Sequence, residues 1–110
     1  MPDSKRTAAN KRTKPIRDFS RAPDFFTDWK KLERSGKHDM HRLKEAMLLL
    51  IANDGPLPPE WKDHELKGAG RNVRECHVKG DLLLVYRLLE KDSREIVTFL
   101  RAGTHSEVLP

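Results

Sequence analysis

The sequence is poor in cysteine and has no long apolar run. Cys76 is the only cysteine among 110 residues, which excludes a disulfide framework and a cysteine zinc site. The longest apolar run covers residues 46–52, far short of the roughly 20 residues that cross a bilayer. The basic N-terminus is not followed by the apolar segment that a secretory signal requires. These absences predict a cytoplasmic protein with no membrane segment.

The positive charge of the chain is unevenly distributed. Lys and Arg number 22 and Asp and Glu number 17, which gives a net charge of +5. Residues 1–14 hold five basic residues, one acidic residue and no large apolar side chain, which predicts a basic disordered arm. Residues 15–110 therefore carry only +1, and they are long enough for one domain. The charge favours an anionic partner without identifying it.

Two amphipathic segments follow a short strand-like stretch at residues 15–20. Apolar residues recur at helical spacing in residues 24–35 and again in residues 39–53. Gly36 is suited to end the first helix, and Asp39 is suited to cap the second. The short link between the two segments predicts a helical hairpin.

Residues 55–72 form a long loop that is rich in proline and glycine. In a compact domain such a loop is usually functional or disordered, and its large apolar side chains favour a functional one. Three strand-like runs follow, at residues 73–78, 82–89 and 95–101, and the short turns between them require antiparallel neighbours. These elements predict an α+β domain, in which the hairpin packs on a small antiparallel sheet made of this three-stranded meander and the short N-terminal strand.

Three histidines are predicted to gather at one edge of this sheet. His77 ends the first meander strand, Asp81 follows across the turn, and His105 comes just after the third strand. In a meander these positions share an edge, and the loop that carries His64 can fold over it. Near pH 7 a neutral imidazole takes up a proton and an imidazolium releases one. The cluster therefore has the groups that acid–base catalysis needs.

Such a cluster is suited to cleavage of RNA. Attack of the 2′-OH on the adjacent phosphate needs one group to remove the 2′ proton and another to protonate the departing 5′ oxygen. Cations then stabilise the negative charge on the phosphoryl oxygens. The cations nearest to the histidines in the sequence are Lys67, Arg71, Arg74 and Arg101.

Other interpretations of these residues stay open. Each histidine taken alone is more often a surface or turn residue, which is what we expect of His38 and His41. A metal site built from histidine and aspartate is a second alternative, although its ligands lack the short-spaced pair that zinc motifs usually show. We expect Cys76 to be a packed strand residue, and Trp61 to lie in the core rather than to stack on a base.

Several short motifs resemble the YafQ-type toxins of the RelE/ParE superfamily. They are LPPEWKDHELKG at residues 57–68, HVKGD at 77–81, LVYR at 84–87 and RAGTH at 101–105. The resemblance covers about residues 15–109 and leaves residues 1–14 outside it. It implies a RelE-like fold and a toxin of a bacterial type II toxin–antitoxin system.

The resemblance also implies an activity and a set of partners. Such a toxin is a metal-independent endoribonuclease (an mRNA interferase) that needs no cofactor and cuts mRNA in the A site of the 70S ribosome, with contacts to 16S rRNA. A cognate antitoxin neutralises it, and operator DNA is bound only through the toxin–antitoxin complex. Arg71 and Arg74 match basic positions of the family. The catalytic residues of the family match His64, His77, Asp81 and His105.

Two positions depart from the family pattern. Leu82 stands where tryptophan is common, and Leu109 replaces an aromatic residue near the C-terminus. If those aromatics hold the substrate base, codon preference or rate differs in this chain. Two other classes of function remain open, a toxin of the same superfamily that binds DNA gyrase and a plain basic RNA-binding module. Gyrase binding needs no proton-transfer groups, so the histidines favour the nuclease.

Overall fold

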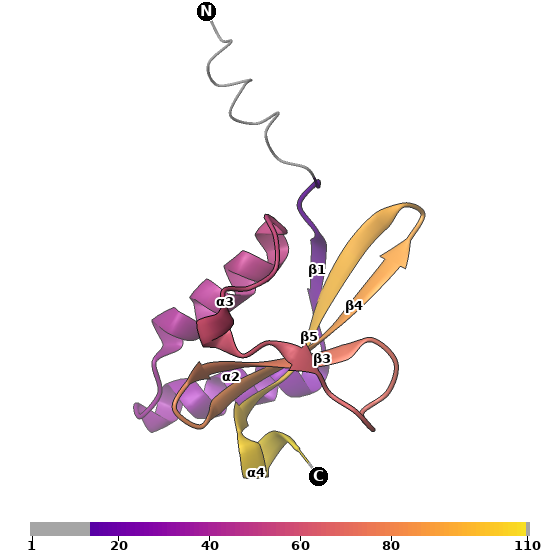
Figure 1. The fold of residues 1–110 in the computed structure, drawn as a ribbon. Coiled ribbons are helices and arrows are strands. Elements are labelled where there is room, and N and C mark those ends of the chain that lie inside the picture. The colour runs from indigo at the N-terminus through magenta and orange to yellow at the C-terminus, as the bar shows by residue number, and fades with distance from the viewer. Residues whose placement is uncertain (1–13, 110) are drawn as a thin grey trace, which may run out of the picture.

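Five strands form one sheet, and the helices pack against it (Figure 1). The computed structural model describes residues 14–109, so the predicted basic arm lies outside the described residues apart from Lys14. The elements are β1 (Asp18–Arg21), α2 (Pro23–Ser35), α3 (Met40–Ala52), the 3₁₀ helix η1 (Pro59–Trp61), β2 (His64–Glu65), β3 (Val73–Lys79), β4 (Leu82–Lys91), β5 (Arg94–Thr104) and α4 (His105–Val108). The strand order is β1-β5-β4-β3-β2. The predicted α+β class is confirmed.

The predicted meander is present as β3, β4 and β5, which pair antiparallel. The sheet has two further features. β1 pairs parallel with β5, so the sheet is mixed, and the long loop contributes the two-residue strand β2 at the opposite edge. A period of two indicates a strand but not the direction of a distant partner. That direction depends on long-range contacts, such as the one between the hydroxyls of Ser20 and Thr98, 2.9 Å apart.

Local signals set the ends of both long helices as predicted. Gly36 ends α2 in a left-handed conformation (φ 67°), which is costly for a residue with a Cβ. The carboxylate of Asp39 accepts a 3.0 Å hydrogen bond from the backbone N–H of Arg42 and so caps α3. Asn53, also left-handed, follows the last turn of α3. Within residues 14–109, no helix is both long and apolar enough to span a membrane.

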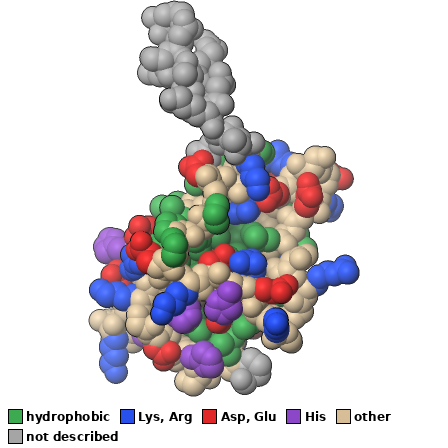
Figure 2. Space-filling view, viewed as in Figure 1, with side chains coloured by type: hydrophobic (Ala, Val, Ile, Leu, Met, Phe, Trp, Pro, Cys, Tyr) green, Lys and Arg blue, Asp and Glu red, His purple; other side chains and the backbone are tan. Residues whose placement is uncertain are grey.

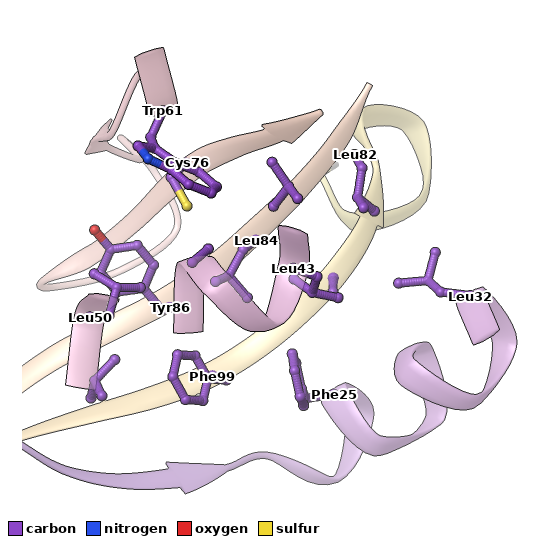
Figure 3. Close-up of a cluster of buried hydrophobic side chains, with 14 residues drawn as sticks. Phe25, Leu32, Leu43, Leu50, Trp61, Cys76, Leu82, Leu84, Tyr86 and Phe99 are labelled. Atoms are coloured by element: carbon purple, nitrogen blue, oxygen red, sulfur yellow. The ribbon is translucent and has the colours of Figure 1, made fainter. Parts of the chain in front are cut away.

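The main core lies between the helices and one face of the sheet, which we call the helix face (Figure 3). Alternate strand residues such as Cys76, Leu84 and Tyr86 point to this face, because side chains alternate along a strand. They pack in one cluster with Phe25 of α2 and Leu43 of α3, and all five residues are at most 2% exposed. Burial of this cluster supplies the main driving force for folding.

The opposite face of the sheet, which we call the site face, is partly covered as well. Val73, Leu83 and Val85 are buried but lie outside the main core cluster. The short helix α4 packs close to the end of β5, where a Cβ added to Gly103 would lie 2.9 Å from Cγ1 of Val108. A glycine is therefore needed for this approach. The approach holds α4 at the edge of the sheet where β5 ends.

Candidate active site

The meander brings His77, Asp81 and His105 to the same edge of the sheet. His77 of β3 lies opposite Leu83 of β4, and Leu83 lies opposite Gly103 of β5. Asp81 occupies the exposed turn between β3 and β4, and His105 begins α4 directly after β5. Neighbouring strands lie about 4.8 Å apart, so three strands bring these residues within the span of a few nucleotides.

His64 joins this edge from β2, which pairs with β3 and places His64 opposite Glu75. The ring centroid of His64 lies 6.2 Å from that of His77, so both imidazoles can contact neighbouring atoms of one ligand. Figure 2 shows histidine side chains gathered on one part of the surface, with acidic and basic side chains beside them. The long loop thus reaches the edge of the sheet, as its sequence predicts.

Two neighbours of His64 fix the loop from the helix face. Trp61 is 2% exposed and packs in the main core, as predicted. Asp63 accepts hydrogen bonds of 3.0 and 3.3 Å from Arg74, and another from the hydroxyl of Tyr86. Burial, and then the bond to Asp63, raise the pKa of Tyr86, so its hydroxyl stays a donor. Because side chains alternate, Asp63 points into the protein and His64 points to the site face.

Glu75, which lies beneath His64, is not among the site residues that the sequence predicts. Glu75 is 5% exposed, and its Oε1 lies 2.9 Å from Nε2 of His64. Nδ1 of the same ring lies 2.7 Å from the backbone carbonyl oxygen of Lys62. Among the described residues, Oε2 of Glu75 is the one buried side-chain polar atom without a hydrogen-bond partner. A signal for Glu75 was present, since it precedes His77 by two residues and strand residues two apart share a face.

His105 is held in place by the cap of α4. Thr104 donates from both its N–H and its hydroxyl to Oε1 of Glu107, each at 2.9 Å. These bonds, the backbone one first, lower the pKa of Glu107 to about 2, and Lys31 contributes at 3.3 Å from Oε2. His105 itself is exposed. The surface hollow beside it is also lined by Leu66, Lys67, Gly68, Ala69 and Leu109.

Two of the four predicted cations lie in the loop that borders the histidines. Lys67 and His105 line the same hollow, of about 350 Å³. Arg71 follows on the same loop and is exposed. The side chain of Lys67 can therefore meet the phosphate of a strand that lies along the histidine edge.

The other two predicted cations form internal ion pairs. Arg74 binds Asp63 on the helix face, as described above. Arg101 donates to both carboxylate oxygens of Asp28 in α2, at 2.7 and 3.2 Å, and these bonds raise the pKa of its guanidinium further. The structure therefore places Arg74 and Arg101 between elements of the fold and does not bring them to the histidine cluster.

Cys76, the two leucines that depart from the family pattern, and His41 lie outside the histidine cluster. Cys76 is fully buried, and burial raises the pKa of its thiol to about 12, so it is not a nucleophile at neutral pH. Leu82 is 2% exposed and packs in the main core, whereas Leu109 borders the hollow beside His105. His41 is exposed on α3.

In residues 14–109, no group of three or more His, Cys, Asp or Glu side chains is placed to hold a metal ion.

Comparison with known proteins finds a matching family and similar chains. Residues 17–110 match a family described as the bacterial toxin of type II toxin–antitoxin system, YafQ. The chain is 39% identical over 90 residues to the mRNA interferase toxin YafQ of Escherichia coli K12, which covers 82% of this chain and 92% of that protein. The E. coli DinJ–YafQ complex contains a similar chain, with a TM-score of 0.77, 37% identity and coverage of 86% of this chain and 99% of that chain.

A metal-bound toxin from Helicobacter pylori is similar as well, with a TM-score of 0.72 and 36% identity over 86% of this chain and all of that chain. The predicted metal independence of this chain therefore stays a prediction. The α+β fold of these relatives is the RelE-like fold that the sequence predicts. The family match and the identity together show that this chain belongs to the YafQ family of bacterial toxins of type II toxin–antitoxin systems.

Proposed function

We propose that this toxin is a ribosome-dependent endoribonuclease that cuts mRNA in the A site without a metal ion or another cofactor. The observation that carries the proposal is the gathering of His64, His77, Asp81 and His105 at one edge of the sheet. Similar proteins from E. coli are named mRNA interferase toxins, which supports the same substrate class.

The reaction needs only proton transfer and positioning. The 2′ oxygen attacks the adjacent phosphorus, a bond forms between them, and the bond from phosphorus to the 5′ oxygen breaks. The 2′ proton goes to a base and the 5′ oxygen receives a proton from an acid, which leaves a 2′,3′-cyclic phosphate and a 5′-hydroxyl. Asp81 and one histidine act at the 2′-OH, and another histidine faces the departing oxygen. Each such transfer typically contributes about 10²–10⁴-fold to the rate.

Lys67 and Arg71 supply the positive charge at the scissile phosphate. Both lie on the loop beside the histidines, and Lys67 lines the hollow that contains His105. Charge stabilisation at phosphoryl oxygens is strongest from side chains that need no rearrangement during the reaction. Arg74 and Arg101, which the sequence also suggested, support this site by fixing the loop and α4 through their ion pairs.

Contacts with the ribosome supply the affinity for RNA that the domain alone lacks. Residues 15–110 carry a net charge of only +1, so the domain alone has little general affinity for RNA. A basic face of α2 is suited to contact 16S rRNA, because Lys30, Lys31 and Arg34 line one surface hollow with Thr27 and Ser35. Cations and hydroxyls of this kind bind the sugar–phosphate backbone without reading its sequence. The ribosome would then present the mRNA strand to the histidine edge.

A cognate antitoxin is the second proposed partner. The toxin of the similar E. coli structure is bound to DinJ in a toxin–antitoxin complex, which supports a partner of the same kind here. Operator DNA would be bound only through that complex. A gene for a small acidic protein with a DNA-binding N-terminus directly upstream would support this pairing.

Single alanine variants at His77 and His105 test the nuclease. Each is expected to lower cleavage of mRNA on purified ribosomes by about 10²–10⁴-fold, because each removes a proton-transfer group. His41→Ala is the control for loss of a histidine, since His41 is exposed on α3 and is not among the four proposed catalytic groups. Full growth inhibition and full cleavage by both variants would overturn the proposal. DNA damage on expression, without cuts in translated mRNA, would point instead to a gyrase-binding toxin.

A further inference from the structure

The candidate site contains a buried carboxylate that the proposed reaction does not use. We infer that Glu75 is a positioning residue that holds His64 in its doubly protonated form, so that His64 is the acid that protonates the departing 5′ oxygen. This inference rests on the proposed function and assigns one of its two proton transfers. It follows from the two contacts of the His64 ring, 2.7 Å to Lys62 and 2.9 Å to Glu75.

The contact at Nδ1 fixes the first proton. A backbone carbonyl oxygen can only accept a hydrogen bond, so at 2.7 Å from the Lys62 oxygen Nδ1 must carry a hydrogen. Lys62 adopts a left-handed conformation (φ 49°) after η1, which is rare for a residue with a Cβ. Its neighbours Trp61 and Asp63 are anchored in the protein. The carbonyl that faces His64 is therefore part of a fixed turn.

The contact at Nε2 places a second proton between the two side chains. Two acceptors do not approach to 2.9 Å, so one hydrogen lies between Nε2 of His64 and Oε1 of Glu75. An imidazole is ordinarily a stronger base than a carboxylate, so we assign this hydrogen to Nε2, and both nitrogens of His64 are then protonated. Glu75 is only 5% exposed, and no other ion pair to it is found among the described residues. The imidazolium is thus the one positive charge in direct contact with this carboxylate.

The surroundings of the His64–Glu75 pair strengthen the attraction between the two charges. Val85, the cross-strand partner of Glu75, is buried and apolar. The titratable groups that face the pair are His77, two residues along β3, Arg87, two residues after Val85, and Lys62, which lines a hollow with His77. A partly desolvated ion pair is strengthened because solvent screens it less.

The placement of His64 suits the release of this proton to a substrate. The side chain of His64 is 50% exposed although that of Glu75 is 7% exposed, so a ligand can reach the ring but not the carboxylate. In the reaction the departing 5′ oxygen approaches the exposed side of the ring, shares the hydrogen on Nε2 with Oε1 of Glu75, and takes it as the bond to phosphorus breaks, while His64 keeps the hydrogen on Nδ1. The proton taken from the 2′-OH by the base returns to His64 through solvent, so protons balance over one turnover. His77, 6.2 Å away, and Asp81 are left for the 2′-OH side.

The Glu75→Gln variant separates the effect of the negative charge of Glu75 from the effect of its hydrogen bond to His64. The amide of Glu75→Gln can still hydrogen-bond Nε2, but it removes the negative charge that stabilises the imidazolium. Glu65→Gln is the matched control, because Glu65 is exposed on the adjacent residue of β2 and the charge change is the same. Single-turnover cleavage on ribosomes should fall about tenfold or more for Glu75→Gln at neutral pH, and partly recover at lower pH. Ribosome affinity and the rate of Glu65→Gln should be unchanged, and Glu75→Asp should restore part of the rate.

A second measurement does not depend on cleavage. Nitrogen NMR of the His64 ring at neutral pH should show both nitrogens protonated in the wild-type toxin and one protonated in Glu75→Gln. A wild-type rate and pH profile for Glu75→Gln, or a neutral His64 ring in the wild-type protein, would overturn the inference. If the wild-type protein shows the doubly protonated ring but cuts no mRNA, the proposed nuclease fails and the assignment of Glu75 as the partner of the imidazolium stands.

Discussion

The two faces of the sheet differ in how their polar side chains are paired. On the helix face, Arg74 and Tyr86 both bind Asp63, so every charged or hydroxyl group of that network has a partner. On the site face, Glu75 keeps one buried oxygen without a partner, and His77 borders a surface hollow. The same strands supply both faces, because adjacent residues point in opposite directions. Stability and chemistry can therefore change independently at neighbouring positions.

Leu84→Ala should have the largest effect on the helix face. Leu84 is fully buried in the main core, so its truncation is expected to lower the free energy of unfolding by about 2–5 kcal/mol. Cleavage by the folded fraction should stay near the wild-type level, since Leu84 points away from the histidines. Urea denaturation gives the first quantity, and cleavage per folded molecule gives the second. A large loss of activity without a loss of stability would break the division between the faces.

The contrast between the faces was only partly predictable from the sequence. Gly36 and Asp39 act through the backbone next to them, so local patterns suffice to place the helix ends. Arg74 lies an odd number of residues from His77, so alternation alone already places it on the other face. The position of Arg101 was not predictable in this way. A register shift between Val85, the partner of Arg101, and Tyr86 interrupts the alternation.

Local sequence patterns also do not predict which distant segments pair with each other. The parallel pairing of β1 with β5 depends on where the whole chain folds back, not on the few residues of β1. The His64–Glu75 contact requires β2, a two-residue strand that is too short to leave a period in the sequence. Residue types thus suggested a histidine site, whereas the two hydrogen-bond partners of the His64 ring became visible only in the structure.

Asp63→Ala should lower both stability, which depends on the helix face, and cleavage, which depends on the site face. Its effect on stability should be smaller than that of Leu84→Ala. Asp63 lies on the helix face but immediately precedes His64, and it holds Arg74 and Tyr86. Its loss leaves partly buried donors unpaired, which is expected to cost about 1–3 kcal/mol of unfolding free energy. The freed loop should also lower cleavage by about tenfold, because misplacement of a catalytic group by about 1 Å is costly. Denaturation and single-turnover cleavage measure the two effects.

Asp18→Ala is the control for Asp63→Ala. Asp18 also pairs with an arginine, Arg94, but both side chains are largely exposed. Exposed ion pairs contribute about 0–1 kcal/mol, so this variant should differ little from wild type in stability and not at all in cleavage. An Asp63→Ala protein that matches Asp18→Ala in both measurements would show that the loop before His64 is held by other contacts.

Glu107→Gln should lower the free energy of unfolding the least, and the loss should depend on pH. The hydrogen bonds from Thr104, followed by Lys31, lower the pKa of Glu107 from its ordinary 4.5 to about 2. A carboxyl group with a lowered pKa in the folded state contributes stability above its unfolded pKa and loses it as the pH falls through the folded value. The wild-type protein should therefore exceed Glu107→Gln in stability by less than about 1 kcal/mol at neutral pH, because the group is exposed.

The difference between the two proteins should be constant from neutral pH down to about pH 5 and should shrink between about pH 4.5 and pH 2. Glu90→Gln provides the reference, since Glu90 is exposed on β4 and bears no cap. Comparing the two variants at each pH removes the titration of all other carboxylates from the result. A Glu107→Gln curve parallel to that of Glu90→Gln down to pH 2 would mean that the cap of α4 does not depend on the charge of Glu107. The placement of His105 would then rest on the close packing of Val108 against Gly103.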